Sequence, residues 1–374
     1  MNKKSLASLL MLSISFLATA QDNNVISTAV PSLSITPDSR AGGMGDVGAA
    51  TTPDVNSQFW NPSKYVFMES QTGVSVSYTP WLRKLVDDID LLYLAGYWKL
   101  DSRQAFSASL RYFSLGTISL MDEFGIQTTS VSPNEFAFDA AYSRMLSDKL
   151  SASVGLRYIS SDLGVQSEDM QRGATVAADV SAYYKTPISL STGDGQLAFG
   201  LNASNIGGKI SFDKGTTSAF IPTNLRLGTS FDYPIDAYNR ISFSGDANKL
   251  MVPTPNSAKI AADPSYYNKM SSITGVFGSF SDASGGYKEE LREISYSVGA
   301  EYAYNKQFFI RGGYFDEDTY KGNRKFFTAG AGFKLTLMQI DAAYTIATTP
   351  SSPLDGTLRI SLSFDMLGMK EMMK

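Results

Sequence analysis

The side chains that most often carry out enzyme chemistry are missing from this chain. Its 374 residues include no histidine and no cysteine. The commonest general base, the thiolate nucleophile and the usual ligands of transition metals are therefore absent. A Ser–His–Asp triad is excluded as well. We expect no catalytic residues, no metal and no cofactor.

Acidic clusters are the remaining candidates for metal binding or acid–base chemistry. One consists of Asp87, Asp88 and Asp90, and another spans residues 316–318, Asp-Glu-Asp. Carboxylate oxygens bind Ca²⁺, but neither cluster has the spacing of an EF-hand loop. We interpret both clusters as hydrated surface loops.

A glycine-rich stretch over residues 43–48, Gly-Met-Gly-Asp-Val-Gly, matches the G-x-G-x-x-G pattern of dinucleotide sites. Such a site needs a strand before the motif and a helix after it. Here Pro31, Pro37 and Pro53 surround the motif, and no βαβ pattern follows. We predict instead that these glycines let the backbone turn tightly and pack closely.

The first twenty residues have the pattern of a secretory signal peptide. Lys3 and Lys4 precede a mostly apolar stretch, 6–18, and Ala18-Thr19-Ala20 supplies a small-x-small cleavage site. We predict that residues 1–20 are a signal peptide and that the protein is exported. The net charge of −4, with no basic run, indicates that nucleic acid is not a partner.

Most of the remaining chain alternates between apolar and small or polar residues, as β-strands do. In the segment 150–158, for example, Leu150, Val154 and Tyr158 alternate with Ser153 and Arg157. Many such segments reach the roughly nine to eleven residues that a tilted membrane strand needs. We count about 14 candidate strands, an even number as a closed barrel requires. They are 73–80, 89–99, 104–119, 134–146, 149–161, 173–185, 196–206, 223–233, 239–249, 293–304, 307–316, 324–335, 339–348 and 356–365.

The connections between these segments alternate between longer and shorter ones. This is typical of outer-membrane barrels, which have long external loops and short periplasmic turns, if both ends of the mature chain are periplasmic. The connection 186–195 is long for a turn. We therefore predict an all-β fold: a transmembrane antiparallel β-barrel over residues 73–365, with a periplasmic tail at 366–374.

The longest connection, 250–292, contains Tyr266, Tyr267 and Tyr287 together with a Gly285-Gly286 pair. Connections beyond about 12–15 residues are uncommon unless they are functional or disordered. Loops rich in tyrosine and glycine bind proteins through adaptable contacts. We take the three tyrosines as candidate protein contacts; a disordered external loop is the alternative.

Residues 21–72 do not alternate, and two motifs within them resemble a known family. The stretches 39–45, Ser-Arg-Ala-Gly-Gly-Met-Gly, and 59–63, Phe-Trp-Asn-Pro-Ser, resemble the start of FadL-like outer-membrane proteins. There, such motifs belong to a plug, or hatch, that precedes the first strand. The resemblance implies a hatch over residues 21–72. The motif residues are Arg40, Gly42, Gly43, Met44, Gly45, Trp60, Asn61 and Pro62.

Over residues 1–374 the chain more closely resembles the PorV (LptO) family, the barrel component of the type IX secretion system. The resemblance implies a non-enzymatic protein of a Gram-negative outer membrane, in contact with its lipid and lipopolysaccharide. Its external face would engage the C-terminal signal domain of cargo leaving the translocon barrel and carry it to the sortase and attachment complex. Tyr266, Tyr267 and Tyr287 would then be cargo contacts.

Two other functions remain open. A FadL-like transporter would pass a hydrophobic ligand through the hatch and the lumen, although the inward positions are mostly Ser, Gly, Asp and Arg. An enzyme acting on lipopolysaccharide, such as a deacylase, would need an unusual nucleophile because histidine is absent.

Overall fold

The computed structural model of the chain describes residues 24–122, 124–165, 170–349 and 352–365. The predicted signal peptide, 1–20, and the predicted C-terminal tail, 366–374, lie outside these residues.

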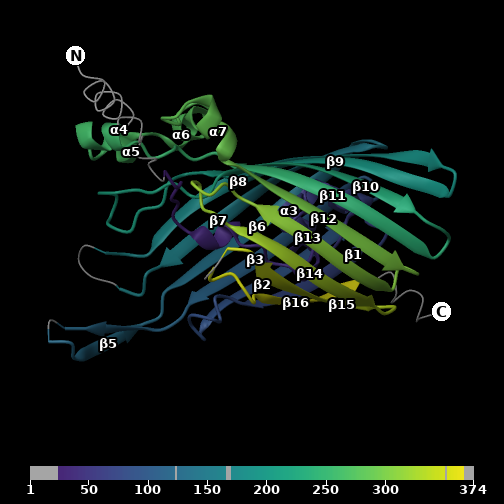
Figure 1. The fold of residues 1–374 in the computed structure, drawn as a ribbon, viewed down its shortest axis with the longest axis horizontal. Helices are drawn as coiled ribbons and strands as arrows, with labels where there is room; N and C mark the ends of the chain where they lie inside the picture. The colour runs from purple at the N-terminus through teal and green to yellow at the C-terminus, as the bar shows by residue number, and fades with distance from the viewer. Residues whose placement is uncertain (1–23, 123, 166–169, 350–351, 366–374) are drawn as a thin grey trace, which may run out of the picture.

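Within the described residues, fourteen antiparallel strands form one closed barrel (Figure 1). The first and last strands, β1 and β16, close it, with Val76 opposite Leu362. The predicted fold class is confirmed. The barrel strands are β1 (Thr72–Pro80), β2 (Ile89–Lys99), β3 (Gln104–Leu115), β6 (Asn134–Ser147), β7 (Leu150–Asp162), β8 (Gly173–Leu190), β9 (Gly193–Gly207), β10 (Asn224–Pro234), β11 (Asn239–Leu250), β12 (Ile294–Tyr304), β13 (Phe308–Asp316), β14 (Lys325–Lys334), β15 (Met338–Ala347) and β16 (Leu358–Asp365).

Two connections differ from the prediction. The segment expected to be one strand over 104–119 ends at Leu115, because Gly116 has a φ of +79° and turns the chain. Beyond it, β4 (Ile118–Met121) and β5 (Gln127–Val131) form a separate hairpin that projects past the barrel wall (Figure 1). The connection expected at 186–195 is shorter than predicted, since β8 continues to Leu190.

The strands place apolar side chains outside and small polar ones inside. In β1, Val74 and Val76 are exposed while Ser75 and Ser77 are buried. This arrangement suits a barrel that faces lipid, and the other strands repeat it with outward Leu, Phe, Tyr, Val and Ile. None of the described helices is long and apolar enough to cross a bilayer.

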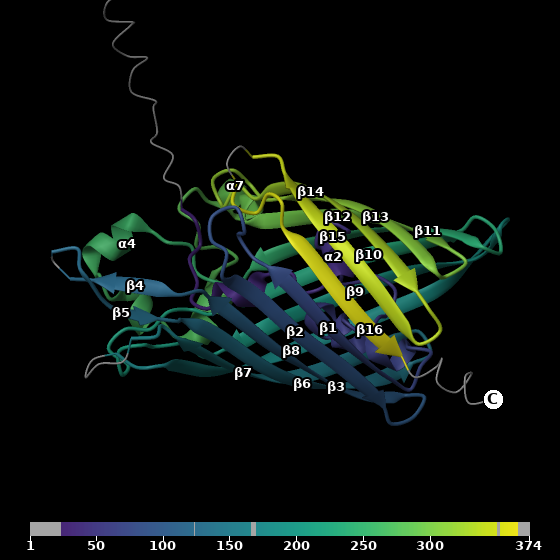
Figure 2. The same cartoon turned by 90° about the horizontal axis from the view of Figure 1, so that it is seen from below.

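The segment before β1 lies inside the barrel (Figure 2). It consists of short helical turns joined by extended chain, and its side chains are mostly buried. We call residues 24–71 the hatch. Its elements are η1 (Pro31–Ser34), α2 (Ser39–Gly42), α3 (Ser57–Trp60) and η2 (Pro62–Phe67).

The hatch crosses the lumen from one end of the barrel to the other. At its start, Lys321 Nζ donates to Asn24 O at 3.2 Å and Ala29 N donates to Phe220 O at 2.9 Å, both among the long loops. At its finish, Thr72 pairs with Trp98 beside a short turn. We call these the loop end and the turn end. The hatch therefore runs the length of the lumen, and its first described residues lie at the loop end.

The long connection before β12 is helical rather than irregular. It contains α4 (Ser257–Ala262), α5 (Tyr266–Lys269), α6 (Ser272–Gly278) and α7 (Tyr287–Arg292), which lie together at the loop end (Figure 1). We call residues 251–293 the cap.

Candidate functional site

The first hatch helix, α2, is fixed at its N-terminus by a buried carboxylate. Asp38 Oδ2 accepts from Ala41 N at 2.9 Å, which is an N-cap bond, and Asp38 Oδ1 accepts from Trp60 Nε1 at 2.6 Å. Two parts of the hatch that are distant in sequence are thus joined at one side chain.

Arg40 of α2 lies at the centre of a charged network that ties the hatch to the barrel wall. Its guanidinium donates to Glu301 Oε1 at 2.8 Å and Oε2 at 3.1 Å, and to Asp54 Oδ2 at 2.8 Å. Arg311 of β13 donates to the same Glu301 at 2.6 Å and to Asp341 at 2.6 Å. Because these groups are buried or nearly so, removing any one of them leaves at least one charge with fewer partners, which is costly away from water.

The first two glycines of the G-x-G-x-x-G stretch lie against the backbone of the wall, and the third lies against Trp60. A Cβ on Gly43 would lie 3.0 Å from the Gly330 Cα. A Cβ on Gly45, whose φ is +70°, would lie 2.6 Å from Tyr314 N and 2.8 Å from Val298 O. These close approaches of backbone to backbone leave no space for a side chain or a nucleotide.

The Asn-Pro motif begins the last hatch element, η2. Asn61 accepts from Ser63 N, and its Nδ2 donates to Ala49 O at 3.0 Å and to Ala182 O of β8 at 2.9 Å. Pro62 occupies the first position of η2, where a missing N–H is tolerated. The motif therefore holds the hatch against the wall.

Several residues of this arrangement were missed by sequence reasoning. Lys64 is fully buried and donates to Gly48 O at 2.8 Å and to Thr51 Oγ1 at 3.1 Å. Glu301 and Arg311 sit at inward positions of strands that otherwise alternate. A charged residue at an inward position of a predicted membrane strand was the signal that could have found them.

The three candidate tyrosines of the cap do not have equal access to solvent. Tyr287 is 77% exposed at the start of α7. Tyr267 donates from its hydroxyl to Thr254 O at 2.8 Å, and its ring meets the Tyr266 ring edge-on at 5.1 Å. The strongly exposed apolar side chains of the cap are on α6, where Ile273 is 70% exposed and Phe277 is 74% exposed.

Two lysines attach the cap to the barrel, and we call this cluster the clasp. Lys249, at the end of β11, donates to Glu290 at 3.0 Å and to Glu293 at 2.6 Å. Lys321, in the β13–β14 loop, donates to Glu293 at 3.0 Å and to Glu289 at 2.6 Å. Burial would raise the pKa of Glu289, but its bond to Lys321 holds that pKa below its ordinary value.

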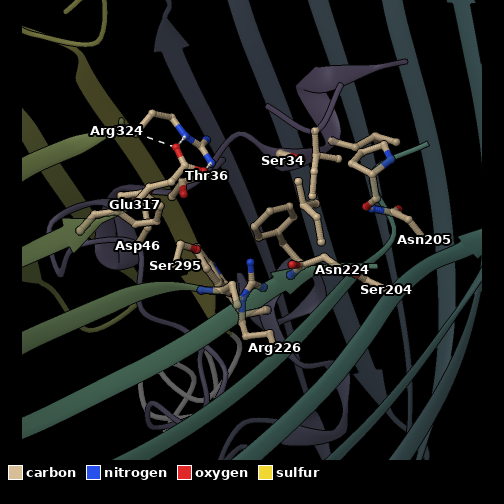
Figure 3. Close-up of a pocket in the computed structure, with 18 of the residues that line it drawn as sticks. Ser34, Thr36, Asp46, Ser204, Asn205, Asn224, Arg226, Ser295, Glu317 and Arg324 are labelled. Carbon is tan, nitrogen blue, oxygen red and sulfur yellow. Dashed lines mark hydrogen bonds and ion pairs between the residues drawn. The ribbon is translucent and has the colours of Figure 1, made fainter. Parts of the chain in front are cut away.

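Two cavities lie at the loop end beside the start of the hatch. One, of about 330 Å³, is lined mainly by apolar side chains, and the other, of about 100 Å³, mainly by polar ones. Figure 3 shows the polar cavity, with Arg226, Arg324 and Asp46 around it.

The acidic clusters are divided among separate partners. Asp88 accepts from Thr117 N, and Asp90 accepts from the Tyr78 hydroxyl. Asp316 pairs with Lys325, and the neighbouring Glu317 is held by Arg324. Over the part of the chain that the structure describes, no group of three or more acidic residues could hold a metal.

A closed barrel with an apolar exterior and a lumen filled by its own N-terminal segment defines a plugged transmembrane β-barrel of the outer-membrane type. A family model described as "Type IX secretion system protein PorV" matches residues 18–257, more than half of the chain. The chain belongs to this family. It is an outer-membrane protein of the type IX secretion system.

Curated proteins gave no sequence match. Among solved structures, a deletion mutant of the monoaromatic hydrocarbon channel TodX has 11% identity and a TM-score of 0.52, covering 87% of this chain and 98% of that one. The P. putida toluene transporter TodX has 12% identity and a TM-score of 0.51, covering 88% and 97%. A Pseudomonas aeruginosa FadL homologue has 12% identity and a TM-score of 0.47, covering 88% and 98%. The two TodX structures show a shared fold.

Proposed function

We propose that this protein is the carrier barrel of the type IX system. It binds the C-terminal signal domain of cargo at the loop end, receives that cargo from the translocon barrel and carries it to the sortase and attachment complex. Binding and handover need no covalent chemistry in this chain. The role fits membership of the family and a chain without histidine or cysteine.

The observation that carries the proposal is the unpartnered apolar surface of the cap. Ile273 and Phe277 are four residues apart on α6 and therefore lie on one face. Tyr287 adds a third large, exposed side chain. Away from the lipid-facing wall, clustered exposed apolar groups indicate a binding surface, and aromatic residues supply much of the energy of protein interfaces.

A folded cap also presents these side chains at low entropic cost. The clasp holds α7 through two lysines, and Asn268 of the cap accepts from Ser218 N at 2.5 Å. The loop 207–222 and the cap therefore form one surface. A surface that is ordered before binding loses less entropy on binding than a flexible loop does.

The test is binding of an isolated cargo signal domain to the purified barrel. The triple variant Ile273→Ser, Phe277→Ser and Tyr287→Ser should weaken binding by about a hundredfold, because truncation of an interface anchor costs about 1 kcal/mol and three such losses sum to about 3 kcal/mol. Tyr238→Ser is the matched control, since Tyr238 is a 62% exposed aromatic in a turn-end connection. Equal binding by the triple variant and the control would rule out this surface.

In cells, a deletion strain distinguishes the functions. A carrier role predicts unprocessed cargo in the periplasm and loss of cargo attached to surface lipopolysaccharide. Restoring the strain with the triple variant should leave the defect, whereas Tyr238→Ser should correct it. Normal secretion in the deletion strain would refute the proposal.

The second candidate is a FadL-like transporter of hydrophobic small molecules. One observation favours it, the cavity of about 330 Å³ lined by Trp81, Phe113, Leu115 and Phe326. This volume falls at the low end of ligand pockets. Reduced uptake of hydrophobic compounds with normal secretion in the deletion strain would support this candidate instead.

A further inference from the structure

The two loop-end cavities adjoin each other across the first hatch residues. They share Ser34, Thr36, Asp46, Phe315 and Arg324 as lining residues. On one side lies an apolar space of about 330 Å³, and on the other a polar space of about 100 Å³. Together they offer an apolar compartment beside a hydrogen-bonding one.

Two arginines line these cavities and form no direct ion pair among the described residues: Arg226 lies near Asp46 and Asp246, and Arg359 near Asp46. Arg226 donates from Nε to Asn248 Oδ1 at 2.7 Å and stacks on Trp60 at 4.5 Å. Arg359 donates only to neutral oxygens, Thr36 O at 3.3 Å and Thr345 Oγ1 at 2.9 Å. Figure 3 shows the Arg226 side chain directed into the polar cavity. Cations in such surroundings are stabilised by an anionic ligand.

Asp46 lies where the two cavities meet. Its backbone is left-handed, with a φ of +64°, and its buried Oδ1 has no hydrogen-bond partner among the described residues. The other two acids that line the polar cavity, Glu293 and Glu317, are paired with Lys321 and Arg324. Among the acids that line the cavities, Asp46 is therefore the one that competes with an incoming anion for the arginines, whereas Asp246 is held by Gly48 N and Ala49 N.

The lining also suits a peptide. Asn224, Asn248 and Ser295 place amide and hydroxyl groups around the polar cavity, where they can pair with backbone N–H and C=O groups, whereas the Asn205 amide is already held by Arg157 and Pro222 O. An acyl chain carries no N–H or C=O groups along its length that could form hydrogen bonds with these side chains. The observations thus favour a ligand with a carboxylate, an adjoining apolar group and peptide bonds.

We propose that the loop-end cavities receive the extreme C-terminus of a protein chain. Its carboxylate binds beside Arg226, Arg324 and Arg359, and its last apolar side chain enters the larger cavity. This inference rests on the proposed function, since a signal domain at the C-terminus of cargo presents a free carboxylate. A fatty acid carries the same carboxylate and apolar group, and the experiment separates the two sources.

The experiment measures binding of one cargo signal domain in two forms, with a free and with an amidated C-terminus, to the purified barrel in detergent. We expect the free form to bind about tenfold more tightly, because hydrogen bonds to a charged carboxylate are stronger than those to a neutral amide. Equal affinities would overturn the inference while leaving the carrier function intact. Failure of both forms to bind would refute both.

Asp46→Asn is the decisive variant, because asparagine has nearly the same shape and accepts a left-handed backbone. Removing the competing charge should tighten binding of the free form by about threefold to tenfold and leave the amidated form unchanged. Arg226→Gln should weaken the free form alone, whereas the control Arg172→Gln, at an exposed ion pair, should change neither. A structural role for Asp46 would not tighten binding, so unchanged or weaker binding overturns the inference.

A competition arm identifies the source of the carboxylate. Decanoate is the probe, and it should displace the free-form signal domain weakly or not at all, since it lacks peptide groups. Displacement by decanoate at concentrations well below those needed for an unlabelled C-terminal peptide would assign the cavities to a fatty acid and overturn the inference.

Discussion

Replacing Gly45 by alanine should loosen the hatch without opening the barrel. The φ of Gly45 is +70°, and an added Cβ would lie 2.6 Å from Tyr314 N and 2.8 Å from both Tyr314 O and Val298 O. All three atoms are backbone atoms of the wall, so they cannot swing aside as a flexible side chain would.

The expected cost is the sum of two effects. An L-residue in the left-handed region costs roughly 1–2 kcal/mol. Forcing a methyl group into a packed contact costs roughly 1–3 kcal/mol more. We therefore expect hatch docking in Gly45→Ala to be weaker by about 2–5 kcal/mol.

Gly125 provides a matched control. Its φ is +76°, but a Cβ there would meet nothing within 4 Å. Gly125→Ala should therefore cost only the roughly 1–2 kcal/mol of placing an L-residue in a left-handed conformation. That cost affects the projecting hairpin and not the hatch. Any larger effect at Gly45 measures the contact between hatch and wall.

The assay follows the fluorescence of Trp60 during urea titration. The chain has three tryptophans, and Trp60 is a hatch residue that is 2% exposed. Replacing Trp81 and Trp98 by phenylalanine leaves Trp60 as the single reporter of hatch release. Heat-dependent gel mobility reports the barrel separately. Equal urea midpoints for the Gly45 and Gly125 variants would refute the close-packing argument.

Three further outcomes follow from the charged groups. Arg40→Gln should weaken hatch docking by up to roughly 3–5 kcal/mol in the same assay, because Asp54 loses its arginine and Glu301 keeps only Arg311; Arg172→Gln, at an exposed pair, should not. Lys249→Met should loosen α7, which Lys321 alone then holds, and limited proteolysis should cut the cap faster than in the unmodified protein. The Lys269 ammonium holds the pKa of Asp263 at about 2, below the ordinary 3.8. The stabilisation of this cap segment is therefore complete above pH 3.8 and lost as the pH falls through about 2, and carboxyl NMR should show a titration that Asp263→Asn lacks.

The barrel could be predicted from local pattern because the alternation of apolar and polar residues is present within each strand. Val74 and Val76 alternate with Ser75 and Ser77. With lipid on one side of the wall and a packed lumen on the other, the valines must face outward and the serines inward. The errors fell where local pattern ends. Gly116 breaks a strand that the alternation alone would continue, and the turn between β8 and β9 is shorter than its polar composition indicated.

The candidate site was less predictable. Arg40 was recognised as part of a motif. Its charged network also contains Glu301, Arg311 and Asp341, which meet only because the barrel brings β12, β13 and β15 to the same part of the lumen. In the cap, the sequence drew attention to tyrosines, whereas α6 is the element whose apolar face meets solvent. Which side of a short helix is covered depends on tertiary contacts.

The sequence by itself determined the export signal's pattern, the exclusion of histidine and cysteine chemistry, the class of fold and the family resemblance. Composition and period-two alternation are local properties, so they can be read without knowing what lies nearby. Tertiary structure alone decided that the hatch enters from the loop end, that Gly43 and Gly45 meet wall backbone, and that Arg226, Arg359 and Asp46 surround adjoining cavities. These features depend on residues up to some 300 positions apart in the chain, and only closure of the barrel places them together.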